Sequence, residues 1–271
     1  MKCLLLKFLL VYLLPLILFS VATFSQKTQS DAVAETMSNT FNFYGDKLTG
    51  TCFMIIKDGQ QYFVAAAHLF ESFHKSGDIV SVQMVVQNQL QPFNATVYFH
   101  TNRKVDVAVF KLSERINQKL ELPDEYIKDR EFFEQLLPGK GISTDSMFSP
   151  PAMDVFFLGF PLGNLGNEIY GVKLPLVKKA VLSGWVDHNG ITMTLLDGHN
   201  NLGFSGGPVV AYDTVTKKMN LIGVISGYIP EPLDVKQKKK TLSVNANSGI
   251  IICYGKKYID EVFSGNKSPG K

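Results

Sequence analysis

The sequence predicts an all-β protein in which two β-barrels form one compact unit, and three observations support this prediction. Between residues 48 and 263 the chain consists mainly of short apolar segments, separated by turn-forming residues at intervals of roughly ten. Helical periodicity first interrupts this pattern at 113–137. A partly helical segment, 113–151, therefore links two strand-rich blocks, at about 48–112 and about 152–255. With 271 residues, 45% of them hydrophobic, the chain can bury one large core or two modest ones.

The first block divides into strands at its turn signals. In the segment 50–70, GTCFMIIKDGQQYFVAAAHLF, the hairpin signal Asp58-Gly59 separates two apolar runs. Three further strands are predicted for DIVSVQMVVQ, FNATVYFH and DVAVFKL. In the linking segment, LSERINQKL and YIKDREFFEQLL have the spacing of helices or helical turns.

The second block contains six segments with the pattern of strands, and a helix follows them. The six are MDVFFLGFPLG, LPLVKKAVLSGWVD, ITMTLLDG, GGPVVAYD, NLIGVISGY and GIIICYG. The segment KKYIDEVF is expected to form a short C-terminal helix, and 264–271 a tail. The basic cluster KQKKK at 236–240 lies between turn-rich segments and is predicted to be a solvated loop. Because the net charge is only +3 and the other lysines are scattered, no nucleic-acid partner is expected.

The N-terminus has the features of a secretory signal peptide, predicted at 1–25. Two lysines precede an uncharged run from Phe8 to Ser25, and small residues follow the apolar core, which places cleavage near Ala22 or Ser25. The alternative is an uncleaved anchor helix, but the eighteen uncharged residues are short for a bilayer span and Pro15 interrupts them. We therefore expect an exported protein, periplasmic or extracellular, without membrane attachment after cleavage.

Beyond the signal peptide, residues 26–47 are polar with weak periodicity and are expected to form a loose N-terminal arm or a short helix. The mature chain retains two cysteines, Cys52 and Cys253. In an oxidising compartment they can form one disulfide, but their apolar, strand-like surroundings are equally compatible with two separate buried thiols. The histidine and cysteine spacing has no zinc pattern, so no metal ion or organic cofactor is expected.

The glycine-rich segment GFSGGPVV, at 203–210, presents one hydroxyl group, that of Ser205. A serine hydroxyl is a poor nucleophile unless a base, usually histidine, lies beside it and a carboxylate orients that base. Among the five histidines, His68 is distinctive because it ends a strand and follows three alanines, which leave room for close approach. Asp106 begins the strand DVAVFKL. The order His68, Asp106, Ser205 is that of chymotrypsin-type enzymes and differs from the subtilisin and α/β-hydrolase orders.

These segments resemble the trypsin-like (chymotrypsin-fold) serine peptidases, and most of all the bacterial secreted and Deg/HtrA-type branch. Over residues 48–263, the matching pieces are TGTCFMI, VAAAHLF, DVAVFKL, VFFLGFPLG, AVLSGW, GFSGGPVV and LIGVISGY. The resemblance implies two six-stranded antiparallel β-barrels with the active site between them and a short C-terminal helix. It also implies that Ser205 is the nucleophile, His68 the general base and Asp106 the residue that orients it. Because the chain ends soon after this domain, no appended PDZ-type peptide-binding module is expected.

An oxyanion hole is expected at the turn before Ser205. Gly203 lies two residues earlier, so a turn there can direct the amide N–H groups of Gly203 and Ser205 to one spot. The glycines allow left-handed backbone geometry and close approach of a substrate. Phe204 stands between Gly203 and Ser205, at the position where digestive enzymes of the family have an aspartate that pairs with a newly cut N-terminus. No such switch is available here, so the hole is expected to be preformed or set by local packing.

Substrate-binding residues are inferred from the same resemblance. The edge at 226–228 is expected to pair with an extended peptide, and the primary pocket to lie between this edge, residues 199–202 and Gly249. Because His199 stands at the pocket base in place of an aspartate, a preference for lysine or arginine is not expected. His199 either favours an acidic side chain or points to solvent. The expected substrate-binding residues are His199, Asn200, Asn201, Leu202, Ser226, Gly227, Tyr228 and Gly249.

Taken in series, these features predict a secreted or periplasmic serine endopeptidase that cleaves polypeptide substrates through an acyl-enzyme intermediate. An alternative is a catalytically silent module that uses the same fold to bind peptides or proteins, and a further one is a subunit that a partner must activate. Proteins of the silent type usually lack one of the three catalytic residues, whereas this chain has all of them. The sequence predicts no oligomeric state.

Overall fold

The structure is a computed structural model. It describes residues 28–86, 88–116, 141–163, 166–169, 172–237 and 240–265. The expected signal peptide (1–25), most of the predicted helices of the linking segment and most of the tail (264–271) lie outside these residues. The described start of the first predicted helix, 112–116, contains the end of β6 and is not helical. Within the described residues, no helix is both long enough and apolar enough to cross a membrane.

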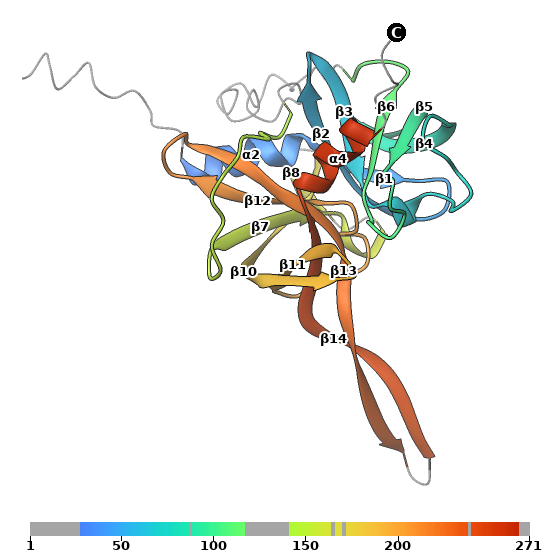
Figure 1. Cartoon of the computed structure of the whole chain (residues 1–271), viewed down its shortest axis with the longest axis vertical. Coiled ribbons are helices and arrows are strands. Elements are labelled where there is room, and N and C mark those ends of the chain that lie inside the picture. The colour runs from blue at the N-terminus through green and yellow to red at the C-terminus, as the bar shows by residue number, and fades with distance from the viewer. Residues whose placement is uncertain are drawn as a thin grey trace, which may run out of the picture.

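Two closed six-stranded barrels make up the fold, as the sequence predicts (Figure 1). In the first barrel the strands follow the order β1-β2-β3-β6-β5-β4, and in the second β10-β11-β14-β13-β12-β7. The strands of the first barrel are β1 (Thr40–Tyr44), β2 (Thr49–Lys57), β3 (Gln60–Ala65), β4 (Ile79–Val86), β5 (Gln89–Phe99) and β6 (Ala108–Leu112). Those of the second are β7 (Asp154–Gly159), β10 (Leu176–His188), β11 (Ile191–Asp197), β12 (Pro208–Asp213), β13 (Lys218–Gln237) and β14 (Lys240–Gly255).

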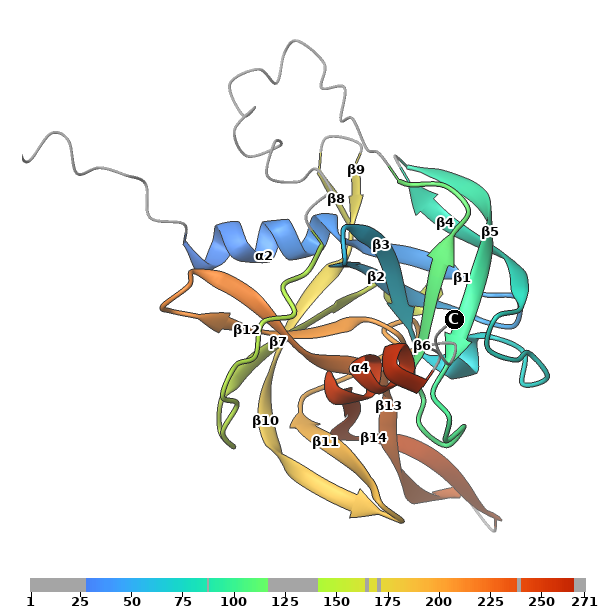
Figure 2. The same ribbon diagram turned by 45° about the horizontal axis from the view of Figure 1, so that its top comes forward.

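Three smaller elements complete the described fold. A separate hairpin is formed by β8 (Asn167–Ile169) and β9 (Val172–Leu174). The helix α2 (Gln29–Ser38) packs against β1 and β13, and so touches both barrels. The predicted C-terminal helix is present as α4 (Lys257–Gly265). It contacts β5 and β6 of the first barrel and β14 of the second, and therefore lies where the barrels meet (Figure 2).

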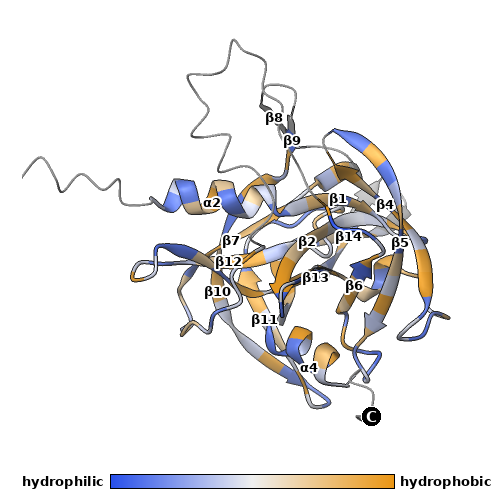
Figure 3. Cartoon of the chain, turned by 90° about the horizontal axis from the view of Figure 1, so that it is seen from above, coloured by the Kyte–Doolittle hydropathy of each residue, from blue (hydrophilic) through white to orange (hydrophobic). Residues whose placement is uncertain are grey.

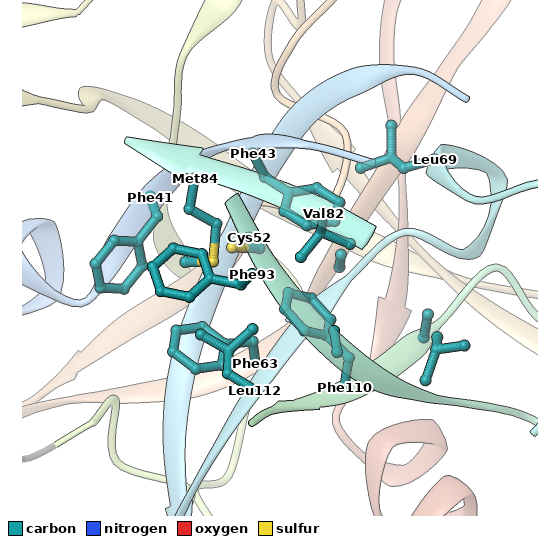
Figure 4. Close-up of a cluster of buried hydrophobic side chains, with 14 of the residues drawn as sticks. Phe41, Phe43, Cys52, Phe63, Leu69, Val82, Met84, Phe93, Phe110 and Leu112 are labelled. Carbon is teal, nitrogen blue, oxygen red and sulfur yellow. The ribbon is translucent and has the colours of Figure 1, made fainter. Parts of the chain in front are cut away.

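The strands alternate between a core inside each barrel and a third core between the barrels. On β2, Cys52 and Met54 point into the first barrel, whereas Phe53 and Ile55 pack against the second. Strands with one exposed face, such as β4, instead alternate hydrophobic and polar residues (Figure 3). Inside the first barrel, phenylalanine rings stack, with the centroids of Phe43 and Phe110 5.1 Å apart (Figure 4). Burial on both faces explains why strands such as β2 are apolar runs and fixes the position of one barrel against the other.

Of the predicted N-terminal arm, 26–47, the described residues 28–47 contain the short helix that was one of the two expected forms, and a strand, so the first barrel begins earlier than the expected boundary at residue 48. A capping box starts α2, because the Thr28 hydroxyl accepts from the amide of Asp31 (3.2 Å) and the Asp31 carboxylate accepts from the amide of Thr28 (2.7 Å). Residues 40–44 then form β1, which closes the barrel between β2 and β4. The strand was hidden in the sequence because threonine and asparagine, which are buried here, alternate with its phenylalanines.

The prediction of a solvated loop at 236–240, between turn-rich segments, is wrong in one respect. The segments on both sides are paired β-strands, and the pairing extends to Gln237 and Lys240. The outer parts of β13 and β14 continue as a two-stranded ribbon from Pro230↔Asn247 to Gln237↔Lys240, projecting from the barrel (Figure 1). The hydroxyl of Ser248 donates to the carbonyl of Ile229 (2.6 Å), so Ile229 faces β14 and the residues on either side of it face away. The ribbon prolines Pro230 and Pro232 thus lie on the outer edge, where their missing N–H costs no ladder bond.

Both cysteines of the described chain are free thiols, which resolves the choice left open by the sequence. Cys52 lies in the core of the first barrel and Cys253 in that of the second. Burial raises the pKa of Cys253 to about 12 and that of Cys52 well above its ordinary value. Because the thiolate is the reactive form, both residues should be inert in the folded protein.

We therefore expect that neither thiol reacts with iodoacetamide at pH 8 under native conditions, and that both react after unfolding in guanidinium chloride. Peptide mass mapping of the two samples measures this directly. The melting temperature should not change when dithiothreitol is added. Recovery of a peptide pair linked through Cys52 and Cys253 would contradict the structure.

Candidate active site

His68 and Asp106 are brought together by neighbouring strands of the first barrel. β3 pairs with β6 in register, with Ala65 opposite Ala108. His68 follows β3 in the short 3-10 helix Ala67–Leu69, and Asp106 precedes β6, so both lie at the same end of this strand pair. The imidazole Nδ1 of His68 lies 2.7 Å from Oδ2 of Asp106, and the backbone amide of His68 donates to Oδ1 at 2.8 Å. The carboxylate therefore holds both the ring and its backbone.

Ser226 connects this pair to Ser205, on the second barrel. Its hydroxyl donates to Oδ2 of Asp106 at 2.6 Å. Its carbonyl oxygen accepts a hydrogen bond from the Ser205 hydroxyl at 3.0 Å. The sequence predicted Ser226 only as part of the peptide-binding edge. It did not predict the contact with Asp106, because the sequence does not show which distant residue the Ser226 side chain meets. In this resting arrangement the Ser205 hydroxyl is hydrogen-bonded to the Ser226 carbonyl, and among the described residues no hydrogen bond joins that hydroxyl to His68.

Opposing influences act on the Asp106 carboxyl, whose side chain is 16% exposed. Burial alone would raise its pKa. The hydrogen bond and charge of the His68 ring, the Ser226 hydroxyl and the His68 amide outweigh burial and lower the pKa of Asp106 below its ordinary value. The group is therefore a carboxylate at neutral pH, and it accepts a hydrogen bond from Nδ1–H of His68, which leaves Nε2 unprotonated and able to act as a base.

The turn that carries Ser205 has backbone geometry that glycine permits. The amide of Phe204 donates to the carbonyl of Asn201 (3.3 Å), and Gly203, third in this turn, has a φ of +101°. This is the type II pattern, which requires a positive φ at the third residue. A Cβ on Gly203 would lie 2.3 Å from the carbonyl oxygen of Phe160, so the position excludes any side chain. The predicted need for glycine at 203 thus has two causes, conformation and space.

The alanines before His68 are explained by the same turn. A Cβ on Gly206, whose φ is +84°, would lie 2.1 Å from the carbonyl oxygen of Thr51 and 2.9 Å from the amide nitrogen of Ala66. Both Ala65 and Ala66 are fully buried. The turn of the second barrel therefore packs directly on the backbone that leads to His68, as the small residues suggested.

Thr51, on β2 of the first barrel, holds the turn from the other side, a role that the sequence does not indicate. Its amide donates to the carbonyl of Ser205 (2.8 Å), and its hydroxyl donates to the carbonyl of Gly203 (2.7 Å). The same hydroxyl accepts from the amide of Phe160 (3.1 Å). With both carbonyls engaged on this side, the amides of Gly203 and Ser205 donate to no protein acceptor in the described part of the chain. They are available to a ligand, as an oxyanion hole requires.

Phe204 shows how the turn is fixed without the family's ion pair. Its side chain is fully buried in the core of the second barrel. The ring packs edge-on against Phe157, with centroids 5.0 Å apart, and a Cβ on Gly159 would lie 2.7 Å from its Cδ1. Of the two expectations, a preformed hole or one set by packing, the contacts describe a turn anchored by an aromatic side chain in the core.

The sequence profile of the trypsin-like peptidase domain matches residues 50–218, more than half of the chain. The chain belongs to the trypsin-like peptidase family. The peptidase is thereby a serine-type endopeptidase by class. No curated protein is significantly similar to it in sequence.

Solved structures share the fold of the peptidase at low sequence identity. The protease Rv3671c from M. tuberculosis, in its active form, has a TM-score of 0.54 and 15% identity, over 88% of this chain and 85% of that chain. The HtrA-type protease AlgW, solved with a tripeptide, has a TM-score of 0.54 and 16% identity, over 88% of this chain and 63% of that chain. At this identity the likeness concerns the fold.

Among the expected substrate-binding residues of the peptidase, those at 199–202 are hydrogen-bonded to β14. The backbone of Gly198 donates to Gly249 (2.9 Å), and the side chain of Asn247 donates to the carbonyl of Asn200, which joins the 199–202 segment to β14. Added Cβ atoms on Gly227 and Gly249 would meet open space or an atom no closer than 3.9 Å. His199 is exposed, whereas Asn200 is buried with its Oδ1 lacking a partner among the described residues. Leu202 is 74% exposed, and Tyr228 pairs with Ile251.

In the described ranges, no group of three or more histidine, cysteine, aspartate or glutamate side chains is placed to hold a metal ion.

Replacing Ser226 by alanine tests the electrostatics of Asp106. Hydrogen bonds to charged groups are worth about 1.5–3 kcal/mol, so we expect Ser226→Ala to lower the free energy of unfolding by about this amount at pH 7. A lowered carboxyl pKa stabilises the fold above the unfolded value of about 3.9, and this contribution is lost as the pH falls through the folded value. The difference between the two proteins should therefore shrink as the pH is lowered below about 4.

Denaturant unfolding from pH 7 down to the acid transition measures this difference. Ser248→Ala is the matched control, because its hydroxyl donates to the neutral carbonyl of Ile229 and its effect should not vary with pH. Equal pH profiles for the two variants would show that the Ser226 hydroxyl does not stabilise the charged form of Asp106.

Proposed function

We propose that the chain is an exported serine endopeptidase in which Ser205, His68 and Asp106 form the catalytic triad. The observation that carries this proposal is the Asp106 carboxylate, which accepts from His68 of its own barrel and from Ser226 of the other. Ser226 also links this carboxylate to Ser205. The Ser205 hydroxyl donates to the Ser226 carbonyl, and the Ser226 hydroxyl donates to Asp106. A protein that used the fold only for binding would not need an oriented imidazole at this place.

In the proposed reaction the Ser205 hydroxyl leaves Ser226 and donates to Nε2 of His68. Its oxygen attacks the peptide carbonyl while His68 takes the proton, and Asp106 stabilises the imidazolium that forms. The amides of Gly203 and Ser205 receive the oxyanion. The C–N bond then breaks as His68 returns the proton to the leaving amine, and water hydrolyses the acyl-enzyme by the same steps in reverse order.

The proposed substrate is an extended polypeptide that pairs with the edge at 226–228. In an antiparallel strand, alternate residues face the open side, and after Tyr228 these are Pro230 and Pro232. Since proline has no N–H, the edge offers no backbone donor at either position. Backbone pairing with substrate should therefore end at Tyr228, and contacts further along the peptide would come from side chains.

Fluorophosphonate labelling tests the proposal without knowledge of the substrate. Wild-type protein should be labelled on Ser205, and Ser205→Ala should not be labelled. His68→Ala should react at least about a hundredfold more slowly, since general-base catalysis is worth this much or more. A folded wild type that remains unlabelled when purified would favour the silent binding module, and labelling in cell extracts alone would favour a partner-activated subunit.

Export is proposed from the signal peptide at 1–25. Expressed with its native N-terminus in a bacterial host, the full chain should be recovered outside the cytoplasm and should begin within a few residues of Thr23 or Gln26. Intact-mass and N-terminal peptide analysis determines the start. A membrane-bound protein that begins at Met1 would instead support the anchor helix.

A further inference from the structure

Lys178 occupies a position where the second barrel otherwise has apolar side chains. It lies on the inward face of β10, and the next residues on that face, Ala180 and Leu182, are buried in the barrel core. Its neighbour Lys179 points outward and pairs with Asp154 at 2.8 Å. Partial burial lowers the pKa of Lys178. The side chain leads from this inward face to an ammonium group that is partly exposed and also donates hydrogen bonds to the protein.

The acceptors of Lys178 all belong to the segment that leads to Ser205. Its Nζ donates to the carbonyl of His199 and to Oδ1 of Asn201, the latter at 3.0 Å. The same atom lies 5.5 Å from the ring centroid of Phe204 and 6.0 Å from that of Phe157. These distances are within the range in which a cation is attracted to an aromatic face.

The contacts enclose the residue that supplies the first oxyanion donor. Asn201 is the first residue of the type II turn and Phe204 is the last, with Gly203 between them. Lys178 touches both ends of this turn. The central peptide unit of a type II turn carries the Gly203 amide, and the place of that unit is set by the two ends of the turn. Contacts at both ends therefore fix where the Gly203 nitrogen lies relative to β10 and to Ser205.

We propose that Lys178 is a positioning residue for catalysis, whose ammonium group holds the turn at 201–204 so that the Gly203 amide faces the oxyanion. This inference rests on the proposed role of Ser205. It adds the source of the turn's rigidity, because Phe204 anchors the turn by packing alone and provides no charge. Thr51 fixes the carbonyl of Gly203 from the first barrel, and Lys178 fixes the preceding segment from the second.

The test compares Lys178→Met, which keeps the length of the side chain and removes its donors, with wild type. Reaction with a fluorophosphonate is resolved into the rate constant kinact and the binding constant KI. Loss of an oxyanion donor costs about a hundredfold to a thousandfold, so partial loss of its position should lower kinact by about tenfold or more. The binding constant should change by less than about twofold, because the donor acts in the transition state.

Two further variants separate positioning from general stability. Lys178→Arg keeps the charge and the donors and should recover at least half of the lost kinact on a logarithmic scale, roughly a threefold gain. Lys179→Met is the matched control, since this lysine lies on the other face of β10, and its side chain and that of its partner Asp154 are each 58% exposed. It should react like wild type. If Lys178→Met reacted more slowly only because it folds less stably, its melting temperature would fall, and kinact would not be lowered selectively relative to KI.

The outcomes distinguish this inference from the proposed function. A wild type that does not react overturns both, whereas a wild type and a folded Lys178→Met that react equally overturn the role of Lys178 alone. If Lys178→Met does not fold, Asn201→Ala decides, because it removes one acceptor and leaves the ammonium group in place. A kinact lowered several-fold in Asn201→Ala then supports the role of Lys178, and an unchanged kinact overturns it.

Discussion

The relative position of the two barrels is the constraint on which the site depends, since no single barrel contains it. The Asp106 carboxylate of the first barrel accepts from the Ser226 hydroxyl of the second, and Thr51 of the first barrel holds the turn around Ser205. Near the same place, the hydroxyl of Tyr254 in β14 donates to the carbonyl of Lys104 at 3.1 Å. These polar bonds are short-ranged, so a shift of about 1 Å between barrels would break them. The apolar core between the barrels, closed by α4, prevents such a shift.

The sequence predicted those parts of this arrangement that have a local signature. Strand alternation, the hairpin signal and the glycine-rich turn are short-range patterns, and each led to the correct element. It missed β1, because Asn42 and Thr40 are buried polar residues that disguise a strand. It also missed the ribbon, whose prolines and asparagines are typical of turns but here occupy an outer edge where they cost little.

The contacts at the site that the sequence did not predict share one physical cause, which is that the two residues of each contact are distant in the chain. Thr51 and Gly203 are joined across two barrels, as are Ser226 and Asp106. Nothing within a few residues of Thr51 or Lys178 indicates which backbone group each will meet. The one available signal is a break in the pattern of β10, because a lysine stands in a series of inward-facing residues that are otherwise apolar, where a charged side chain is unfavourable. Such a break indicates that a residue has a role, although it does not indicate which one.

The proposed mechanism requires a rearrangement of the resting structure at Ser205. Asp106 is ionised and fixes the ring of His68, and the amides of Gly203 and Ser205 have no protein acceptor among the described residues. What differs from a reactive arrangement is the direction of the Ser205 hydroxyl, which donates to the carbonyl of Ser226. A serine side chain moves between staggered rotamers without any change in the backbone. Thr51 and the packing of Phe204 hold the backbone, so it can keep its position while the Ser205 side chain rotates. A preorganised site requires such a fixed backbone, because the oxyanion donors must already be in place when the hydroxyl attacks.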